Sequence, residues 1–371
     1  MFCFLKCRFK YFPCLIITVV IMSSCDVVHK PHGRETIFDK VVSIPKELVL
    51  DIPYLPPLCD ELPGLKKGFA DIKDGELYYE EEGAGIPLVL INGGPGCTHQ
   101  GFHPYFSQLK DVARIIYYDQ RGTGKSSYDN TGATYTVKQA VEDLESLRKA
   151  LKIDRWAVCG WSYGGLLAQC YALTYPEHCT GLILGAATTG LPFESNRKRE
   201  HMFISQAEWD AIENIGKMGS AGRFTTSAHV IYNKRLAGDW KRWNFYKPTR
   251  EELIRKALYG WSPAPRFEKL MRPDSDKLSE ISFLKGKFDD FEIPALITEA
   301  RWEMGWWDPH RIETMRKNHP HAIVEIFEKS GHVLFADEPE KFFSLLRNFL
   351  EKSSKAHIDY KPGNRLIWPA V

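Results

Sequence analysis

The 371-residue chain has no apolar run long enough to cross a membrane and no large excess of charge of one sign. Its N-terminal apolar stretch, Tyr11 to Met22, holds about a dozen residues, whereas a transmembrane helix needs roughly 20. The 49 basic and 47 acidic side chains leave a net charge of +2, which does not favour a nucleic-acid partner. We therefore expect neither a spanning helix nor nucleic-acid binding.

The sequence also lacks a metal or nucleotide motif. The nine cysteines form no C-x-x-C pair, and no histidine spacing supports a zinc site. His99 and His103 are four residues apart, but an intervening glycine and a following proline disfavour the helix that would align them. Gly124-Lys125-Ser126 resembles the end of a phosphate-binding loop, yet Asp119 stands where that loop requires glycine. We predict no metal and no cofactor.

The first residues have the pattern of an export signal. Three basic residues precede the apolar stretch, and Ser23-Ser24-Cys25 follows it. Small residues before a cysteine resemble the lipobox of bacterial lipoproteins, although Met22 replaces the usual leucine. We therefore predict an exported, membrane-anchored lipoprotein of a bacterial cell envelope, which begins at Cys25 and carries its lipids there. An uncleaved anchor and an ordinary secretory signal are the alternatives.

The remaining chain favours an α/β fold, because 44% of its residues are hydrophobic and short apolar runs alternate with helical patterns. We predict a mostly parallel central sheet with an inserted helical cap, where the alternation stops and tryptophan and charge become dense. The expected divisions are a signal peptide (1–24), a tether (25–67), the first part of the core (68–188), the cap (189–288), the second part of the core (289–352) and a C-terminal tail (353–371).

Individual elements can be predicted from the same patterns. Asp74-Gly75 favours a tight turn between two antiparallel strands. Further buried strands and helices are expected over 87–91, 113–118, 137–151, 155–159, 166–175, 181–185, 293–298, 309–318, 322–327 and 339–350.

The motif Gly160-Trp161-Ser162-Tyr163-Gly164 lies between a predicted strand and a predicted helix. A G-x-S-x-G at that junction is the nucleophile elbow of α/β-hydrolases, in which the glycines allow a strained turn that exposes the serine. The positive N-terminal end of the following helix favours the negative charge that develops during acyl transfer. Ser162 is therefore the predicted nucleophile.

A glycine-rich segment, Asn92-Gly93-Gly94-Pro95-Gly96, ends the predicted strand over 87–91. Glycines at the end of a strand let backbone amides point at a ligand oxygen. We predict that the N–H groups of Gly94 and Tyr163 form the oxyanion hole.

The partners of the nucleophile should follow in the order acid, then histidine. His332 lies in a glycine-preceded loop after the last predicted strand, where a general base must lie to reach Ser162. Glu303 follows the preceding strand and is the predicted acid. Asp308 is its competitor, but Asp308 precedes Pro309 and suits a helix N-cap.

From about Gly68 to Leu350 the chain resembles the prolyl iminopeptidase family of serine aminopeptidases. The resemblance rests on Asn92-Gly93-Gly94-Pro95-Gly96 against H-G-G-P-G, on Asp119-Gln120-Arg121-Gly122-x-Gly124-x-Ser126, on the elbow and on Ser330-Gly331-His332. The acid loop resembles G-R-Y-D, with Glu303 in place of aspartate. The resemblance implies release of an N-terminal proline or similar residue.

One departure concerns the substrate. Trp240-x-x-Trp243-Asn244 resembles a family W-x-x-W-E whose glutamate holds the free amino group, and here that position is the neutral Asn244. We therefore expect Trp243 and Asn244 to contact substrate, with weakened selection of a free amino terminus. The alternatives for binding the amine are the cap acids Glu200, Glu208, Glu213 and Glu251.

The leading hypothesis is a serine hydrolase of aminopeptidase type that acts on a short peptide. A lipase or esterase that acts on a small apolar acyl substrate is the runner-up, because it needs the same triad. A non-catalytic cell-surface binding protein is the third alternative, which loss of Ser162 or His332 would have favoured.

Overall fold

A computed structural model of the chain describes residues 64–191, 204–221, 223, 230, 233–239, 241, 274, 276–279, 282–303, 309–356 and 366–369. Several predictions therefore lie outside the described residues. They concern the signal peptide and Cys25, nearly all of the tether, Trp243 and Asn244 in the cap, and Asp308.

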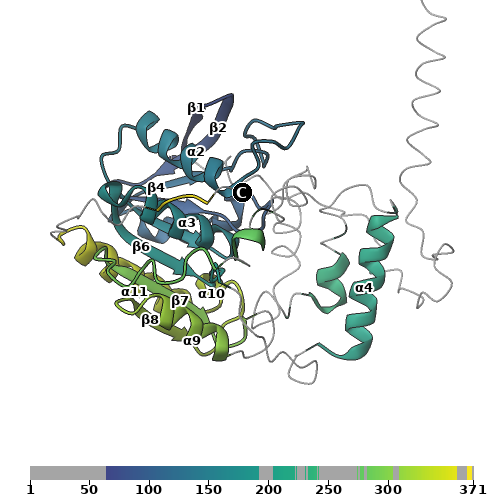
Figure 1. Ribbon diagram of the computed structural model, residues 1–371. Coiled ribbons are helices and arrows are strands. Elements are labelled where there is room, and N and C mark those ends of the chain that lie inside the picture. Colours follow the sequence, from purple (N-terminus) through teal and green to yellow (C-terminus); the bar gives the residue numbers. More distant parts are fainter. Residues whose placement is uncertain are drawn as a thin grey trace, which may run out of the picture.

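An eight-stranded sheet forms the centre of the fold (Figure 1), with the order β1-β2-β4-β3-β5-β6-β7-β8. The β1–β2 and β2–β4 pairs are antiparallel and the other neighbours are parallel. This confirms the predicted α/β-hydrolase architecture. The strands are β1 (Lys66–Ile72), β2 (Gly75–Glu82), β3 (Ile86–Ile91), β4 (Ala113–Tyr118), β5 (Trp156–Trp161), β6 (Cys179–Gly185), β7 (Ala295–Ala300) and β8 (Ile323–Phe327).

Helices cover both faces of the sheet because its parallel strands are apolar on both sides. On one face, Val89, Val158 and Leu182 share a core with the helices α2 and α3. On the other face, Leu88 and Cys159 pack with the helix α11. The helices are α2 (Val137–Ala150), α3 (Tyr163–Thr174), α4 (Gln206–Ser220), α9 (Pro309–Asn318), α10 (Leu334–Asp337) and α11 (Pro339–Ser353), with short turns η3 (His99–Phe102), η4 (Tyr105–Leu109), η5 (Pro176–His178) and the π-helical η7 (Arg235–Asp239).

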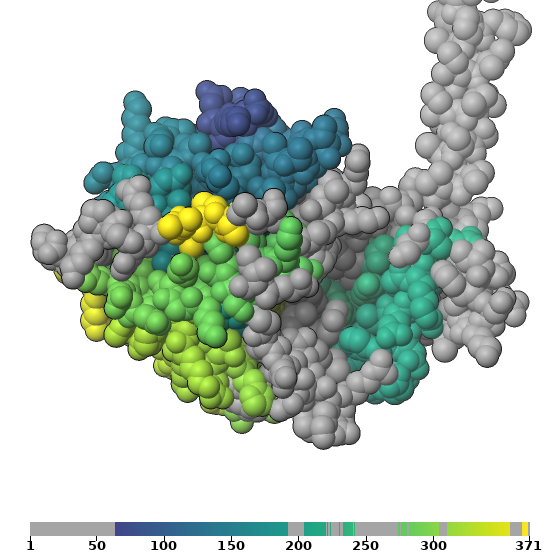
Figure 2. Space-filling view, in the orientation of Figure 1, coloured from purple at the N-terminus to yellow at the C-terminus, as the bar shows by residue number. Residues whose placement is uncertain are grey.

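The hairpin and the tail each refine the sequence prediction. Asp74 has φ 60° in the turn between β1 and β2, a left-handed conformation that a tight hairpin turn requires. The final residues do more than extend over the surface: the Leu366 N–H donates to the Leu173 carbonyl at 2.9 Å, and the Leu366 side chain is buried. Figure 2 shows this segment in yellow between the teal and green parts of the core. Burial of the apolar Leu366 stabilises the attachment.

The chain leaves the sheet after β6 and returns to it at β7. Within this excursion, α4 and η7 share a small separate core that contains Ile212, Ile215 and Ala237. A capping box between Ser205 and Glu208 begins α4. In the part of the chain that the structure describes, every helix is too short or too polar to cross a membrane.

Candidate active site

Ser162 lies in the sharp turn between β5 and α3. Its φ of 55° and ψ of −121° are a strained conformation for a residue with a side chain, as expected of a nucleophile elbow. The Ser162 N–H donates to the Gly185 carbonyl at 3.0 Å, which holds the turn against β6. A Cβ at Gly160 would collide with the Gly164 carbonyl, and one at Gly164 with the Ile91 carbonyl. The two glycines therefore allow the turn to close against β3.

His332 and Glu303 are in direct contact. Nδ1 of His332 donates to Oε1 of Glu303 at 2.6 Å, and both side chains are largely buried. His332 lies in the loop between β8 and α10, and Glu303 follows β7, so the ends of neighbouring parallel strands bring them together. A carboxylate on Nδ1 fixes the ring so that Nε2 is the nitrogen available to accept a proton.

Three hydrogen bonds hold the loop of His332 in place. The Trp161 indole N–H donates to the His332 carbonyl at 3.1 Å. The Trp302 N–H donates to the Ser330 carbonyl at 3.1 Å, which joins the loop of the acid to the loop of the base. The Gly331 N–H donates to Asp337 at 2.8 Å. The loop of His332 is therefore held by Trp161 of β5 on one side and by Asp337 of α10 on the other.

A buried ion pair, which the sequence analysis did not identify, lies behind Glu303. Arg311 of α9 pairs with Glu299 of β7 at 2.5 Å and also lies 3.9 Å from Glu303. It donates to the Ala187 carbonyl at 2.6 Å. Burial raises the pKa of Glu299 to about 7, against the opposing effect of the Arg311 charge. The sequence did contain one indication of this ion pair, because Glu299 is an acidic residue near the end of an otherwise apolar strand.

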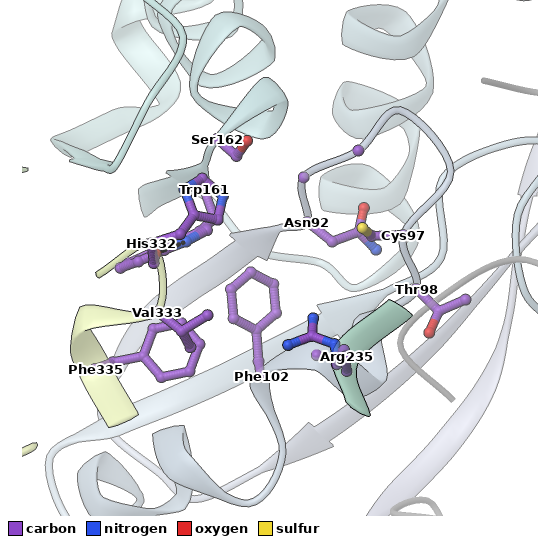
Figure 3. A pocket seen from close by; sticks show the side chains of 13 residues that line it. Asn92, Cys97, Thr98, Phe102, Trp161, Ser162, Arg235, His332, Val333 and Phe335 are labelled. Carbon is purple, nitrogen blue, oxygen red and sulfur yellow. Dashed lines mark hydrogen bonds between the residues drawn. The ribbon is translucent and has the colours of Figure 1, made fainter. Parts of the chain in front are cut away.

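Ser162 and His332 line the same pocket (Figure 3), whose volume is about 130 Å³. Its described walls are apolar on the side of Trp161, Phe102 and Phe335, and the cap contributes Arg235. Arg235 was not a predicted site residue, because nothing in the sequence around it indicates that η7 reaches the pocket.

The loop after β3 forms another wall of the pocket. Gly93 and Gly94 both line it, and a Cβ at Gly93 would lie 2.9 Å from the Ser162 Cβ. Gly94 has φ 115°, which favours glycine. Tyr163 is the first residue of α3, so its N–H has no acceptor within the helix. Both predicted oxyanion residues thus adjoin the nucleophile.

Asn92 supports the same loop through hydrogen bonds to the end of β4. Its side chain donates to the Tyr118 carbonyl at 3.3 Å and accepts from Gln120 Nε2 at 2.5 Å. Gln120 also donates to the Asn92 carbonyl at 2.8 Å. The ends of β3 and β4 are thereby held together beside the elbow.

His99 and His103 converge on Glu80, contrary to the expectation that they would not align without a helix. His103 donates to Glu80 at 2.9 Å, while His99 lies 3.2 Å from Glu80 and 2.8 Å from Asp119. Potential ligand atoms of Glu80, His99 and His103 lie within 4.8 Å of one another. Burial alone would lower the pKa of His99, but the Asp119 and Glu80 carboxylates raise it to about 9. Glu80, His99, His103 and Asp119 therefore form a buried ion-pair network behind the pocket loop.

Among the cap acids considered for amine binding, Glu208 has contacts that assign it another task. It caps α4 through Ser205 and pairs with Lys241 at 2.8 Å. Glu213 lies within α4, and Glu200 and Glu251 lie outside the described residues.

Comparisons with known proteins agree with this geometry. Residues 86–339 match a family model described as the alpha/beta hydrolase fold. The chain is 28% identical over 299 residues to the proline iminopeptidase of Clostridium botulinum (strain Hall), which covers 78% of this chain and 99% of that protein. It is 30% identical to the proline iminopeptidase of Lactobacillus delbrueckii subsp. bulgaricus, over 71% of this chain and 89% of that protein. An esterase structure from Exiguobacterium antarcticum is similar in fold, with a TM-score of 0.57, 21% identity and coverage of 76% and 98%.

Proposed function

Because the chain belongs to the α/β-hydrolase family, we propose that it is a serine hydrolase of aminopeptidase type, which releases an N-terminal proline or similar residue from short peptides. The observation that carries this proposal is the His332–Glu303 pair beside a strained Ser162 in one pocket. The three residues have the roles and chain order that nucleophilic catalysis requires.

In the proposed reaction, Ser162 Oγ attacks the carbonyl carbon of the first residue while His332 Nε2 takes the hydroxyl proton. The N–H groups of Gly94 and Tyr163 stabilise the oxyanion. His332 then returns the proton to the departing amine, which leaves an ester between the first residue and Ser162. Water, deprotonated by His332, hydrolyses this ester and restores the serine. Glu303 stays ionised and stabilises the imidazolium in both halves of the reaction.

Aminopeptidase activity is favoured by the relatives named proline iminopeptidase, with which this chain shares nearly their full length. The pocket also suits a small ring, since a cavity of about 150 Å³ holds benzene and this one measures about 130 Å³. An esterase is the second candidate, because the apolar walls of Trp161, Phe102 and Phe335 would accept an apolar acyl group equally well. The replacement of the family glutamate by Asn244 adds weight to this candidate.

The experiment that separates these functions compares prolyl 4-nitroanilide, its N-acetylated form and 4-nitrophenyl acetate as substrates of the wild type and Ser162→Ala. Aminopeptidase function predicts hydrolysis of the free amine, with loss of several orders of magnitude in kcat for the variant. A fluorophosphonate should label the wild type at Ser162 and leave the variant unlabelled. Hydrolysis of the ester alone would favour the esterase, and full activity of Ser162→Ala would refute both.

We further propose that the protein is exported and anchored to a membrane through lipids on Cys25. The proposal rests on the basic and apolar N-terminal pattern before Ser23-Ser24-Cys25. Two or more acyl chains are needed for stable anchoring, because a single chain binds only marginally. Cys25→Ala should release the protein from the membrane fraction. An intact, unmodified N-terminus in mass spectrometry of the wild type would refute this proposal.

A further inference from the structure

The two carboxylate oxygens of Glu303 face different partners. Oε1 accepts the hydrogen bond from Nδ1 of His332 at 2.6 Å, whereas Oε2 lies 3.9 Å from Nη1 of Arg311. Arg311 lies in α9, is only 7% exposed, and is not among the described residues that line the pocket. The acid is therefore shared between the base and a buried cation outside the described wall of the pocket.

The same guanidinium group is also connected to the elbow. Nη2 of Arg311 donates to the Ala187 carbonyl at 2.6 Å, and the N–H of the next residue, Thr188, donates to the Ser162 carbonyl at 2.8 Å. A guanidinium group is planar and rigid, so the direction of one of its nitrogens fixes that of the other. Arg311 thus links the segment that carries the acid to the segment that supports the nucleophile.

A second carboxylate contacts Arg311. Oε2 of the fully buried Glu299 lies 2.5 Å from Nη1, the nitrogen that also faces Glu303. Burial raises the pKa of Glu299 to about 7; the charge of Arg311 opposes the rise, and the charge of Glu303 adds to it. The two carboxyl groups therefore repel each other, and a cation that faces both reduces the repulsion.

We propose that Arg311 is a positioning residue of the catalytic triad, which keeps Glu303 ionised and in one orientation between the elbow and the base. A glutamate has one more rotatable bond than an aspartate, so an additional contact is needed to hold its carboxylate in place. The acid must stay ionised because it stabilises the imidazolium of His332 in both halves of the reaction. This inference rests on the proposed hydrolase function and adds a residue to its machinery.

The charges around Glu303 predict the direction of a pH effect. Loss of the Arg311 charge leaves the negative charge of Glu303 uncompensated, which favours the protonated imidazole that cannot accept a proton from Ser162. The acidic limb of kcat/KM reports loss of that proton in the free enzyme, so it should move to higher pH. Charged side chains on the neighbouring elements have contacts of their own: Arg301 with Glu328, Lys341 with Glu325, and Asp337 and Glu338 with backbone N–H groups.

The test measures kcat, KM and the pH profile of the wild type, Arg311→Gln and Arg311→Lys. The substrate is prolyl 4-nitroanilide or 4-nitrophenyl acetate, whichever the wild type cleaves, and titration with a fluorophosphonate gives the concentration of active enzyme. Arg311→Gln should lower kcat roughly tenfold to a hundredfold with KM unchanged, less than the ~10³ to 10⁴ of losing the acid itself. Its acidic limb should rise by about one pH unit. Arg311→Lys keeps the charge, so it should restore the limb and part of kcat.

Arg148→Gln is the matched control, because it breaks another buried pair of an arginine and a carboxylate. Arg148 lies in α2 and contacts Glu145 at 2.7 Å, away from the described wall of the pocket. This variant should be less stable than the wild type but keep its kcat per active enzyme and its acidic limb. Equal changes in Arg148→Gln and Arg311→Gln would show a general effect of lost stability and would overturn the proposal.

Arg311→Gln with the kcat and pH profile of the wild type would also overturn it, while the hydrolase function stands. If Arg311→Gln does not fold, the double variant Arg311→Leu with Glu299→Leu takes its place, and the same loss of kcat is required. If the wild type cleaves neither substrate and Ser162 is not labelled, the hydrolase function fails. The low-field proton NMR resonance of His332 Nδ1–H, identified by its loss in Glu303→Gln, then decides. A shifted or missing resonance in Arg311→Gln supports the positioning role, and an unchanged one refutes it.

Discussion

The indole N–H of Trp161 donates a 3.1 Å hydrogen bond to the backbone carbonyl of His332, so the residue before the nucleophile also holds the loop of the base. The Trp161 ring packs against Phe335 with centroids 4.7 Å apart, which fixes the start of α10 as well. One side chain therefore sets the relative position of two groups that must exchange a proton.

Trp161→Phe should lower kcat by roughly threefold to tenfold, because it removes one hydrogen bond of about 0.5 to 1.5 kcal/mol and keeps most of the packing. Displacement of the loop of the base should appear in kcat, and the smaller ring in the pocket wall should appear separately in KM. Trp156→Phe is the control, a similar substitution at the far end of β5, outside the pocket lining. Equal kcat values for Trp161→Phe and the wild type would contradict the positioning role.

Glu303→Gln should reduce kcat by ~10³ to 10⁴, because the amide cannot stabilise the imidazolium of His332 and favours the wrong tautomer. Asp308→Asn should have a much smaller effect, since Asp308 is expected to cap a helix. Steady-state kinetics on prolyl 4-nitroanilide measure both. If the Asp308 variant loses the larger share of activity, the assignments of the two acids must be exchanged.

Arg311→Leu should destabilise the protein by about 3 to 5 kcal/mol, because it leaves the buried Glu299 carboxyl without its charged partner. The double variant Arg311→Leu with Glu299→Leu should be more stable than Arg311→Leu alone, since it removes both charges. The midpoints of urea unfolding give both values. The single variant Glu299→Leu completes the comparison. If the double variant loses as much free energy of unfolding as the two single variants together, the two residues are not coupled.

The network around His99 should make stability depend on pH. The pKa of His99 is raised to about 9, so its contribution is complete below the unfolded value of ~6.5 and is lost as pH rises through 9. The pKa of Glu80 is lowered to about 2, so this carboxylate stays ionised over that range. The free energy of unfolding should fall between pH 6.5 and 9.5 by on the order of 3 kcal/mol more in the wild type than in His99→Gln. Parallel curves for the two proteins would exclude His99 as the titrating group.

The sequence was most informative where a short motif is required by the conformation of the same few residues. The glycines around Ser162 are needed by a turn of a few residues, and the strands that precede Glu303 and His332 are visible as apolar runs. The parallel order of β5, β7 and β8 then brings the three residues to one edge of the sheet. Elements between these motifs could also be predicted from their local apolar patterns. The predicted helix over 309–318, for example, agrees with α9.

The contacts that support the site could not be predicted in this way, because they join residues with no motif around them. Arg311 matters through its distance to Glu299 and Glu303, which depends on how α9 packs against β7. His99 and His103, which follow β3, meet Glu80 of β2 because β4 alone separates these two strands. Their contact depends on the order of strands in the sheet and not on their spacing in the sequence. Arg235 reaches the pocket only through the placement of the cap.

The excursion leaves the sheet at Gly185 and returns at Ala295, which pairs with Leu182 in the neighbouring parallel strand. The two ends of the excursion are thus anchored on adjacent strands, and the connection between them can change length at small entropic cost, since each doubling of a loop costs only about 0.6 kcal/mol. The catalytic residues lie on segments outside this excursion. Substrate preference can therefore diverge by exchange of the inserted segment while the hydrolytic chemistry is inherited unchanged, and this junction is the natural point at which to graft a cap from another enzyme of the fold.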